Sequence, residues 1–347
     1  MSLASVFAPR LGPAIIRVMT QKSACGILAI VMMLTALSAS AEPVRLAMDV
    51  FGEEAQIEVR DVPRDRALEV IRQALLQMFE VSQLADADGD MVGGIGDVHR
   101  AAAAEVEQGA EVDARTFELL RRGLQLCLWS SGAFGPLGGG VYRLWQDGRP
   151  PALDLRHAVN GAGCNLLQLA PGPPQRAAIP STSRLDLRGM VQGFAVDRAA
   201  EVLLAAGIDN ALIEMGDVVR ALGGGPSGGG WPAIVPGVAG TRHPLDQLLL
   251  RDQSLAAVRV EADKKNQGLV DLRTGVRATG VVAVVTVTEF AVDAQALAST
   301  LHVVGYNQGQ LLLGQLSPRP SVLWLLGQNS GKPLESRYRW SSLSRPR

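Results

Sequence analysis

The chain has 347 residues, a formal net charge of −1 and 4% aromatic residues. A nearly neutral chain with so few aromatic side chains offers neither the basic surface nor the stacking positions that nucleic-acid binding needs, so nucleic acid is excluded as a partner. The length is enough for one large domain or for two closely packed ones.

The start of the chain has the pattern of a secretory signal peptide. Arg17 and Lys22 precede an apolar run, residues 24–37, that is too short to span a bilayer comfortably, and Ala39-Ser40-Ala41 then offers a small-residue cleavage site. We therefore predict a signal peptide over residues 1–41 and a periplasmic or otherwise exported protein with no stable membrane span after cleavage. An uncleaved membrane anchor is the alternative.

Two of the three cysteines, Cys127 and Cys164, remain after such a cleavage. In an exported protein they can form one disulfide, and two buried free thiols are the alternative. The spacing of Cys and His residues does not suggest a zinc site.

The hydrophobic pattern predicts helices and strands that do not alternate regularly. Residues 44–59 alternate apolar and polar side chains around Phe51-Gly52, which predicts a β-hairpin. In chain order we then predict helices over 64–81 and 113–128, a glycine-rich turn over 131–140, a helix over 197–206 and a strand over 211–215. A flexible loop over 223–230 leading into 231–235, a strand over 281–288, a helix over 293–304 that Asp293 caps and Gly305 ends, and a last strand over 322–326 follow. We predict a C-terminal tail over 331–347, whose Arg-rich end after Trp340 is loose. This order favours an α+β fold over a doubly wound parallel sheet.

The most informative segment is Asp186–Asp197, which reads Asp-Leu-Arg-Gly-Met-Val-Gln-Gly-Phe-Ala-Val-Asp. It combines glycines in a short apolar run with the start of a helix. Glycine lets a ligand approach the backbone closely, and a helix start directs free N–H groups toward an anion. The pattern therefore predicts a nucleotide phosphate site.

This segment resembles the ApbE family of FAD:protein FMN transferases, whose version reads Asp-Leu-Gly-Gly-Ile-Ala-Lys-Gly-Tyr-Ala-Val-Asp. Three more segments resemble family motifs in the same order, namely Ser131–Pro136, Asp271–Gly275 and Ala296–Ser299. The family motifs read Gly-Ala-Phe-Asp-Pro, Asp-Pro-Arg-Thr-Gly and Asp-Ala-Leu-Ala-Thr. The resemblance implies an ApbE-like α+β domain over residues 42–330, with mixed or antiparallel sheets flanked by helices.

The resemblance also implies FAD as substrate and Mg²⁺ as metal. In the family, a Thr or Ser hydroxyl of an exported redox protein attacks the phosphorus on the FMN side of FAD, AMP leaves, and Mg²⁺ offsets charge on the pyrophosphate. The implied flavin-binding positions are Ala133, Phe134, Gly135, Asp186, Gly189, Gln192 and Gly268. The implied metal ligands are the carbonyl of Val191 and the side chains of Gln295 and Ser299.

Four of these positions depart from the family pattern. Gln295 replaces the metal-binding Asp, and Gln192 replaces a Lys beside the phosphates. Gly135 replaces an Asp, and Gly268 replaces a His, both near the flavin. Because Mg²⁺ prefers carboxylate ligands, we expect its affinity to be weakened or lost, with Asp293 as the fallback carboxylate. Two functions stay open: an FAD:protein FMN transferase, and a catalytically inactive relative that binds flavin or acts as an accessory protein.

Overall fold

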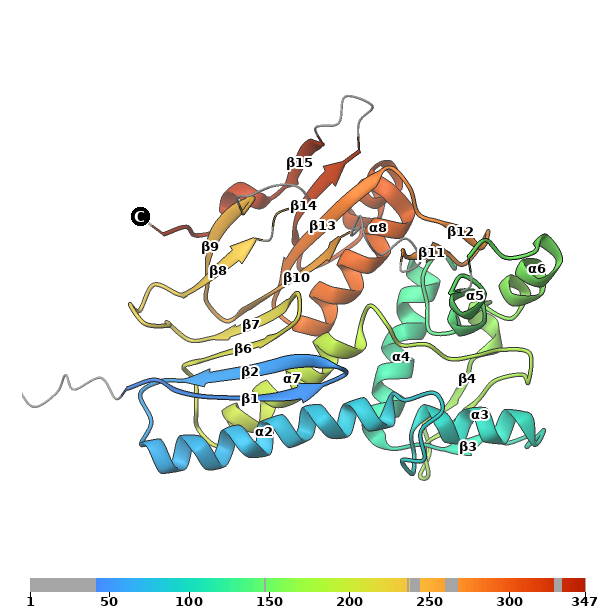
Figure 1. The fold of residues 1–347 in the computed structure, drawn as a ribbon, viewed down its shortest axis with the longest axis horizontal. Coiled ribbons are helices and arrows are strands. Elements are labelled where there is room, and N and C mark those ends of the chain that lie inside the picture. The colour runs from blue at the N-terminus through green and yellow to red at the C-terminus, as the bar shows by residue number, and fades with distance from the viewer. Residues whose placement is uncertain are drawn as a thin grey trace, which may run out of the picture. The chain divides into compact units, whose positions relative to one another are not determined.

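An eight-stranded antiparallel sheet is the centre of the computed structural model, which describes residues 42–146, 148–235, 237, 244–259, 268–327 and 333–346 (Figure 1). The predicted signal peptide, residues 1–41, lies outside the described residues. In spatial order the strands are β1 (Val44–Val50), β2 (Glu53–Val59), β6 (Ala211–Met215), β7 (Val218–Leu222), β10 (Gln253–Arg259), β13 (Val281–Thr288), β14 (Ser321–Leu326) and β15 (Leu334–Tyr338).

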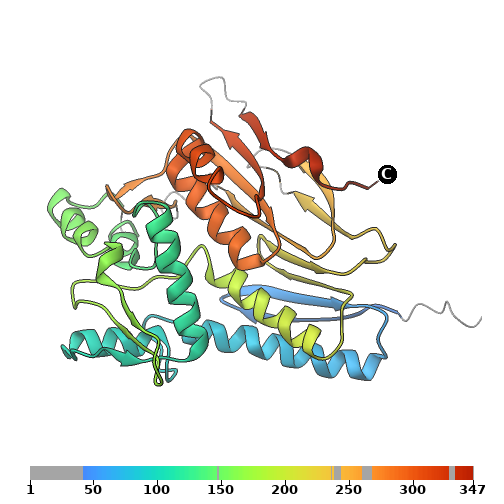
Figure 2. The same ribbon diagram turned by 180° about the vertical axis from the view of Figure 1, so that it is seen from behind.

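Three helices cover one face of this sheet (Figure 2). They are α2 (Arg64–Leu84), α7 (Val191–Ala205) and α8 (Ala291–Leu313). The hairpin of β8 (Trp231–Val235) and β9 (Asp246–Leu250) packs on the other face. Successive side chains of a strand point to opposite faces of a sheet, so β13 packs against both the helices and the β8–β9 hairpin. Val284 belongs to the same hydrophobic cluster as Leu301 of α8, and Val285 to that of Trp231 in β8.

A smaller, mainly helical part occupies residues 95–178 and lies beside the sheet (Figure 1). Its helices are α3 (Ile95–Ala103), α4 (Ala114–Trp129), α5 (Gly139–Leu144) and α6 (Ala152–Asn160), and the 3₁₀ turn η1 covers Cys164–Leu166. Two small sheets accompany them, one of β3 (Ala110–Glu111), β5 (Arg176–Ala178) and β4 (Gln168–Ala170), and one of β11 (Val270–Asp271) and β12 (Val276–Arg277). None of the described helices is both long and apolar enough to cross a membrane.

The predicted α+β class and antiparallel sheet are confirmed, and several boundaries differ. The helix predicted over 197–206 begins at Val191, six residues earlier. The helix predicted over 293–304 begins at Ala291 with Phe290 as its N-cap, so Asp293 lies inside the first turn and is not the cap. The helical path breaks at Gly305, where φ is 77°, and then continues to Leu313.

The predicted C-terminal tail contains the last strand of the sheet, β15. β15 pairs with β14 along its whole length, and the Trp340 side chain that follows it is 1% exposed. The indole N–H of Trp340 donates to Asp246 Oδ2 at 2.8 Å. Residues 334–340 are therefore part of the folded unit, which extends past the boundary predicted at residue 330.

Candidate functional site

The first turns of α7 and α8 lie side by side and join two of the motifs. Ser299 Oγ donates to the Gly189 carbonyl at 3.1 Å, and the Gly193 N–H donates to Gln295 Oε1 at 2.8 Å. A Cβ on Gly189, whose φ is 79°, would lie 2.6 Å from Ser299 Oγ. A Cβ on Gly193 would lie 2.3 Å from the Ala291 carbonyl oxygen, so both glycines are needed for this close approach.

The two helices cap each other. The N–H groups of the first turn of a helix have no partner within that helix, and a side-chain oxygen from elsewhere can accept their hydrogen bonds. Asp197 of α7 accepts from the N–H groups of Ala291 and Val292, both at 2.9 Å, and forms an ion pair with Arg220. Gln295 of α8 accepts in return from Gly193 in the first turn of α7. Sequence reasoning assigned the cap of α8 to Asp293, because Asp197 is 94 residues away from Ala291 along the chain.

A chain of side-chain hydrogen bonds begins at this contact. Gln295 Nε2 donates to Gln192 Oε1 at 2.8 Å, and Gln192 Nε2 donates to Glu53 Oε2 at 3.1 Å. Both ends fix the direction of the amides, because the Gly193 N–H can only donate and the Glu53 carboxylate, when ionised, can only accept. The sequence patterns did not predict a role for Glu53, which lies at the tip of the β1–β2 hairpin.

The three ligands predicted for Mg²⁺ lie close together, but their chemistry does not suit that ion, because the carboxylate of the family motif is absent. Gln295 Oε1 accepts from a backbone N–H and Ser299 Oγ donates to a backbone carbonyl, and both groups are neutral, as is the Val191 carbonyl. Mg²⁺ binds with carboxylate ligands in proteins. Within the described ranges, no group of three or more His, Cys, Asp or Glu side chains is placed to hold a metal ion.

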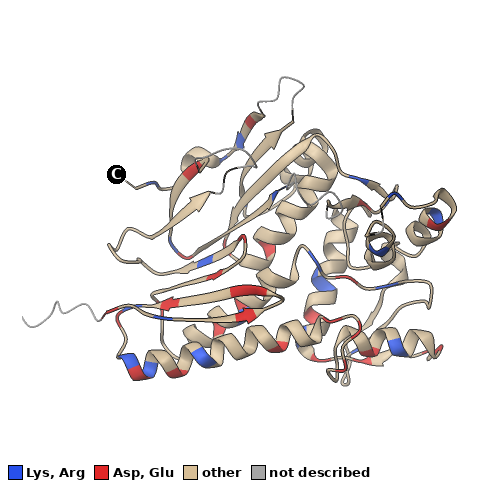
Figure 3. Ribbon diagram, in the orientation of Figure 1, with Lys and Arg blue, Asp and Glu red and all other residues tan. Residues whose placement is uncertain are grey.

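Asp293, the fallback carboxylate, faces away from these donors. It lies two positions before Gln295, which is about 200° around a helix. Its carboxylate pairs with Arg122 of α4 at 3.2 Å, while burial raises its pKa. It lines a groove of about 890 Å³ whose other walls include Arg122, Trp129, Met190, Leu297, Leu316 and Pro318. In Figure 3 an acidic position lies near the start of α8, and the helix carries no Lys or Arg.

The turn between Ser130 and Gly135 carries the next predicted positions. The side chains of Ala133 and Phe134 are buried and pack with Val303 of α8, so they support the turn from the core side. The Ala133 carbonyl accepts from the N–H of Leu272, which ties the turn to the loop between β11 and β12. A Cβ on Gly189 would lie 2.9 Å from Phe134 Cζ, so this turn also meets the start of α7.

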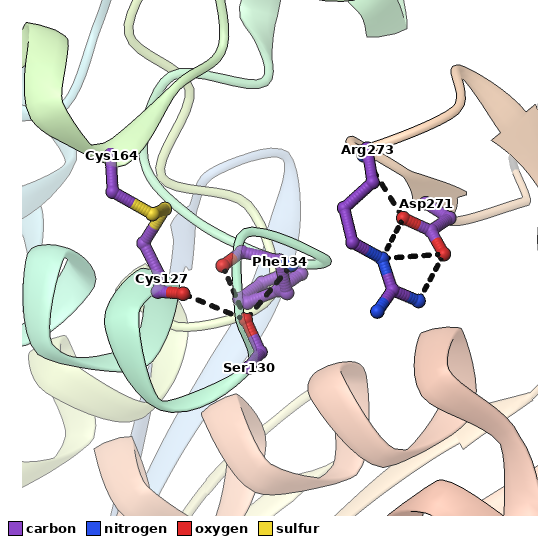
Figure 4. The surroundings of a disulfide bond; sticks show 6 residues. All are labelled: Cys127, Ser130, Phe134, Cys164, Asp271 and Arg273. Atoms are coloured by element: carbon purple, nitrogen blue, oxygen red, sulfur yellow. Dashed lines mark hydrogen bonds and ion pairs between the residues drawn. A yellow bond between two sulfur atoms is a disulfide. The ribbon is translucent and has the colours of Figure 1, made fainter.

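The two cysteines form a disulfide, which decides between the alternatives left open by the sequence. The bond joins Cys127 in the last turn of α4 to Cys164 in η1, beside the turn that holds Ser130 and Phe134 (Figure 4). A Cβ on Gly135 would lie 2.7 Å from Cys127 Cβ and 2.8 Å from Cys127 Sγ. The disulfide therefore occupies the space into which the family's Asp side chain would extend.

Two arginines of the motif segments, to which the sequence assigned no role, lie on turns of this region. Arg188 pairs with Asp186 at 2.6 Å and lies over the ring of Tyr142, 4.5 Å from its centroid. Arg273 pairs with Asp271 at 2.6 Å in the same Asp-x-Arg arrangement (Figure 4). At the predicted position Gly268, an added Cβ would lie 3.9 Å from Arg277 Cδ, and apart from its chain neighbours no other atom of the described residues lies within 4 Å.

The fold and the meeting of the four motif segments describe an ApbE-type domain. The sequence model of the ApbE family matches residues 56–324, and the chain therefore belongs to the ApbE family.

Curated relatives and solved structures agree with this assignment. The chain is 31% identical over 198 residues to the FAD:protein FMN transferase of Rhodobacter capsulatus, covering 54% of this chain and 36% of that protein. It is 31% identical over 127 residues to the FAD:protein FMN transferase of Treponema pallidum (strain Nichols), covering 32% of this chain and 34% of that protein. These matches thus span about a third of each relative.

The solved structures show the fold alone, because their sequence identities are low. The flavin transferase ApbE of Vibrio cholerae superimposes with a TM-score of 0.71 at 20% identity, covering 86% of this chain and 97% of that one. The ApbE protein of Thermotoga maritima gives a TM-score of 0.73 at 21% identity, covering 88% of this chain and 100% of that one.

Proposed function

We propose that this protein is an FAD:protein FMN transferase that attaches FMN to a Thr or Ser side chain of an exported redox protein. The observation that carries the proposal is the meeting of four separate motif segments around the start of α7, through the Ser299–Gly189, Gln295–Gly193 and Leu272–Ala133 hydrogen bonds. Membership of the ApbE family and the names of the two curated relatives support it.

In the proposed reaction the target hydroxyl attacks the phosphorus on the FMN side of the FAD pyrophosphate. A bond forms between the hydroxyl oxygen and phosphorus, the pyrophosphate bond breaks, and AMP and the hydroxyl proton are released. The start of α7 directs its helix dipole toward the bound phosphates, and the left-handed Gly189 keeps side chains away from the backbone there. Arg188 and Arg273 lie on the neighbouring turns, where each guanidinium is paired with an Asp and therefore offers hydrogen-bond donors rather than net positive charge.

The proposed dependence on Mg²⁺ is weak. The residues at the family's metal positions are neutral and already hydrogen-bonded, so they provide little attraction for a divalent cation. We therefore propose that FAD binds mainly through contacts with the protein itself.

A second function, flavin binding without transfer, is favoured by the same neutral Gln192–Gln295 pair. Without a charge on either side chain, the site has less electrostatic stabilisation to offer the transition state of phosphoryl transfer. Such a protein would hold FAD or a partner without releasing AMP.

Export of the mature protein is part of the proposal. The signal-like segment over residues 1–41 supports it. The Cys127–Cys164 disulfide supports it too, because such bonds persist in oxidising compartments such as the periplasm.

Calorimetric titration of the mature protein with FAD, in the presence of Mg²⁺ and again in EDTA, tests binding. Incubation with FAD and an exported flavin-carrying protein then tests transfer, with AMP release and the mass of the target as readouts. Binding with target-dependent AMP release supports the transferase, and binding without AMP release supports the second function. The absence of FAD binding in both conditions would refute both.

A further inference from the structure

We infer that the Cys127–Cys164 disulfide is a positioning element that holds the Ser130–Gly135 turn in its flavin-binding conformation. This inference rests on the proposed function of the turn. The disulfide would then fill the space that the Asp side chain of the family motif would occupy. Flavin affinity would consequently depend on whether the two cysteines are oxidised or reduced.

The first observation is steric. Gly135 packs directly on Cys127, where any larger residue would come within 2.8 Å of the cysteine Cβ and Sγ. Gly135 is not among the glycines with positive φ, so space rather than backbone conformation requires a glycine here. The side chain of Cys127, which forms the disulfide, therefore requires a glycine at position 135.

The second observation is the hydrogen bonding of the turn, which starts at the backbone of the same cysteine. The Gly132 N–H donates to the Cys127 carbonyl at 2.7 Å, and Ser130 Oγ donates to that carbonyl at 3.2 Å. Ser130 Oγ also accepts from the Phe134 N–H at 3.1 Å. Figure 4 shows these contacts of Ser130 with Cys127 and Phe134, including a 3.0 Å contact of the Ser130 hydroxyl with the Phe134 carbonyl that shares its proton with the Cys127 carbonyl. A shift of Cys127 would therefore reach Phe134 through Ser130.

The third observation connects the turn with the rest of the site. Phe134 packs at the position where Gly189 would carry a side chain, and Gly189 accepts the hydrogen bond of Ser299. The neighbouring Ala133 accepts from Leu272, one residue before Arg273. The disulfide therefore fixes one end of a continuous path from α4 to the start of α7.

The disulfide also brings together two segments that the chain separates by 37 residues. Cys164 belongs to η1, which packs against α4. Without the bond, the end of α4 and the turn that follows it lose their covalent link to this neighbour, and more conformations become accessible to the turn.

The test compares FAD affinity of the folded mature protein before and after reduction with a phosphine reductant. Cys127 and Cys164 are the only cysteines after residue 41, so the reductant acts on this bond alone. We expect the Kd for FAD to rise about tenfold, while circular dichroism stays unchanged. The Cys127→Ala/Cys164→Ala variant should bind FAD as weakly as the reduced protein and should not respond to reductant.

Hydrogen exchange separates local positioning from general destabilisation. We expect reduction to accelerate exchange of the Gly132 and Phe134 amides while β13 keeps its protection. Equal FAD affinity in both redox states, or faster exchange spread evenly over the whole protein, would overturn the inference while leaving the proposed function intact. If the oxidised protein bound no FAD, the proposed function would fail as well.

A double-mutant cycle checks the steric step separately. Gly135→Ala should weaken FAD binding about tenfold in the oxidised protein, because the new methyl group displaces the disulfide. In a Cys127→Gly/Cys164→Ala background the same change should alter affinity less than about twofold. Equal effects in the two backgrounds would show that Gly135 is not coupled to Cys127.

Discussion

Replacing Gln295 by Asp tests the amide chain that joins α7 and α8. Gln295 is 6% exposed and both ends of its amide are hydrogen-bonded. Gln295→Asp shortens the side chain by one methylene group, removes the donor to Gln192 Oε1 and places a buried carboxylate opposite an amide oxygen. The variant loses two hydrogen bonds, each worth about 1 kcal/mol, and it buries an unpaired charge. We therefore expect the free energy of unfolding to fall by about 3 kcal/mol.

The double variant Gln192→Lys/Gln295→Asp supplies a cation beside the new carboxylate and should recover about half of that loss. It also offers Mg²⁺ a charged ligand next to Ser299. At a Mg²⁺ concentration about ten times its Kd, the ion would then stabilise the variant by about 1.4 kcal/mol. The wild-type protein should gain less than about 0.3 kcal/mol under the same conditions, because its ligands are neutral.

Urea denaturation near neutral pH, with and without Mg²⁺, measures both effects. Gln310→Asp is the matched control, since Gln310 is an exposed glutamine of the same helix, and loss of its exposed hydrogen bond to the Tyr306 hydroxyl should change stability by no more than about 1 kcal/mol. A Gln295→Asp protein as stable as the wild type would mean that the amide chain does not stabilise the fold. Equal stabilisation of wild type and double variant by Mg²⁺ would refute the conclusion that the present ligands do not fit the ion.

Three further predictions concern the framework around the site. Asp197→Ala removes the cap of α8 and leaves Arg220 buried without its partner, so the free energy of unfolding should fall by about 3–5 kcal/mol in urea denaturation, and a neutral effect would contradict the capping role. Burial lowers the pKa of His302 to about 4. In the unfolded state His302 is protonated below about pH 6.5, whereas in the folded state it stays neutral down to about pH 4. The free energy of unfolding should therefore fall by up to about 3 kcal/mol as the pH is lowered from about 6.5 to 4, and His302→Leu should flatten that part of the stability profile. Trp340→Ala should cost about 3–5 kcal/mol in thermal or urea unfolding, whereas a disordered tail would give no change.

Strands β1, β2, β6, β13 and β14 of the sheet and the three helices that cover it could be predicted because their signals are local, whereas β7 and β10 were not predicted. The alternation in residues 44–59 and the apolar run of residues 281–288 each reflect the face or faces that a strand buries. β15 escaped prediction because Leu334–Tyr338 is largely exposed and mostly polar, so its pairing with β14 leaves little hydrophobic pattern. The same reasoning missed Trp340, a single buried side chain outside any periodic segment.

The site could be located from motifs, but its internal contacts could not. Gln295 was recognised as a departure from the family pattern, yet its partners Gly193 and Gln192 lie more than a hundred residues away along the chain. The spacing of Cys127 and Cys164 was equally compatible with free thiols, because pairing depends on proximity in the fold. Gly135 was noted as a lost carboxylate, whereas the structure shows that the disulfide occupies the space next to it.

The reciprocal caps of α7 and α8 have a consequence for how the protein opens. The N–H groups in the first turn of each helix depend on an acceptor from the other helix: Asp197 of α7 accepts from α8, and Gln295 of α8 accepts from α7. Fraying of either helix start therefore exposes unpaired N–H groups in its partner, so the two starts open together as one cooperative unit rather than one at a time. Amides at the starts of both helices should consequently exchange with solvent at a common rate, and a nucleotide bound against α7 would slow exchange in α8 to the same extent.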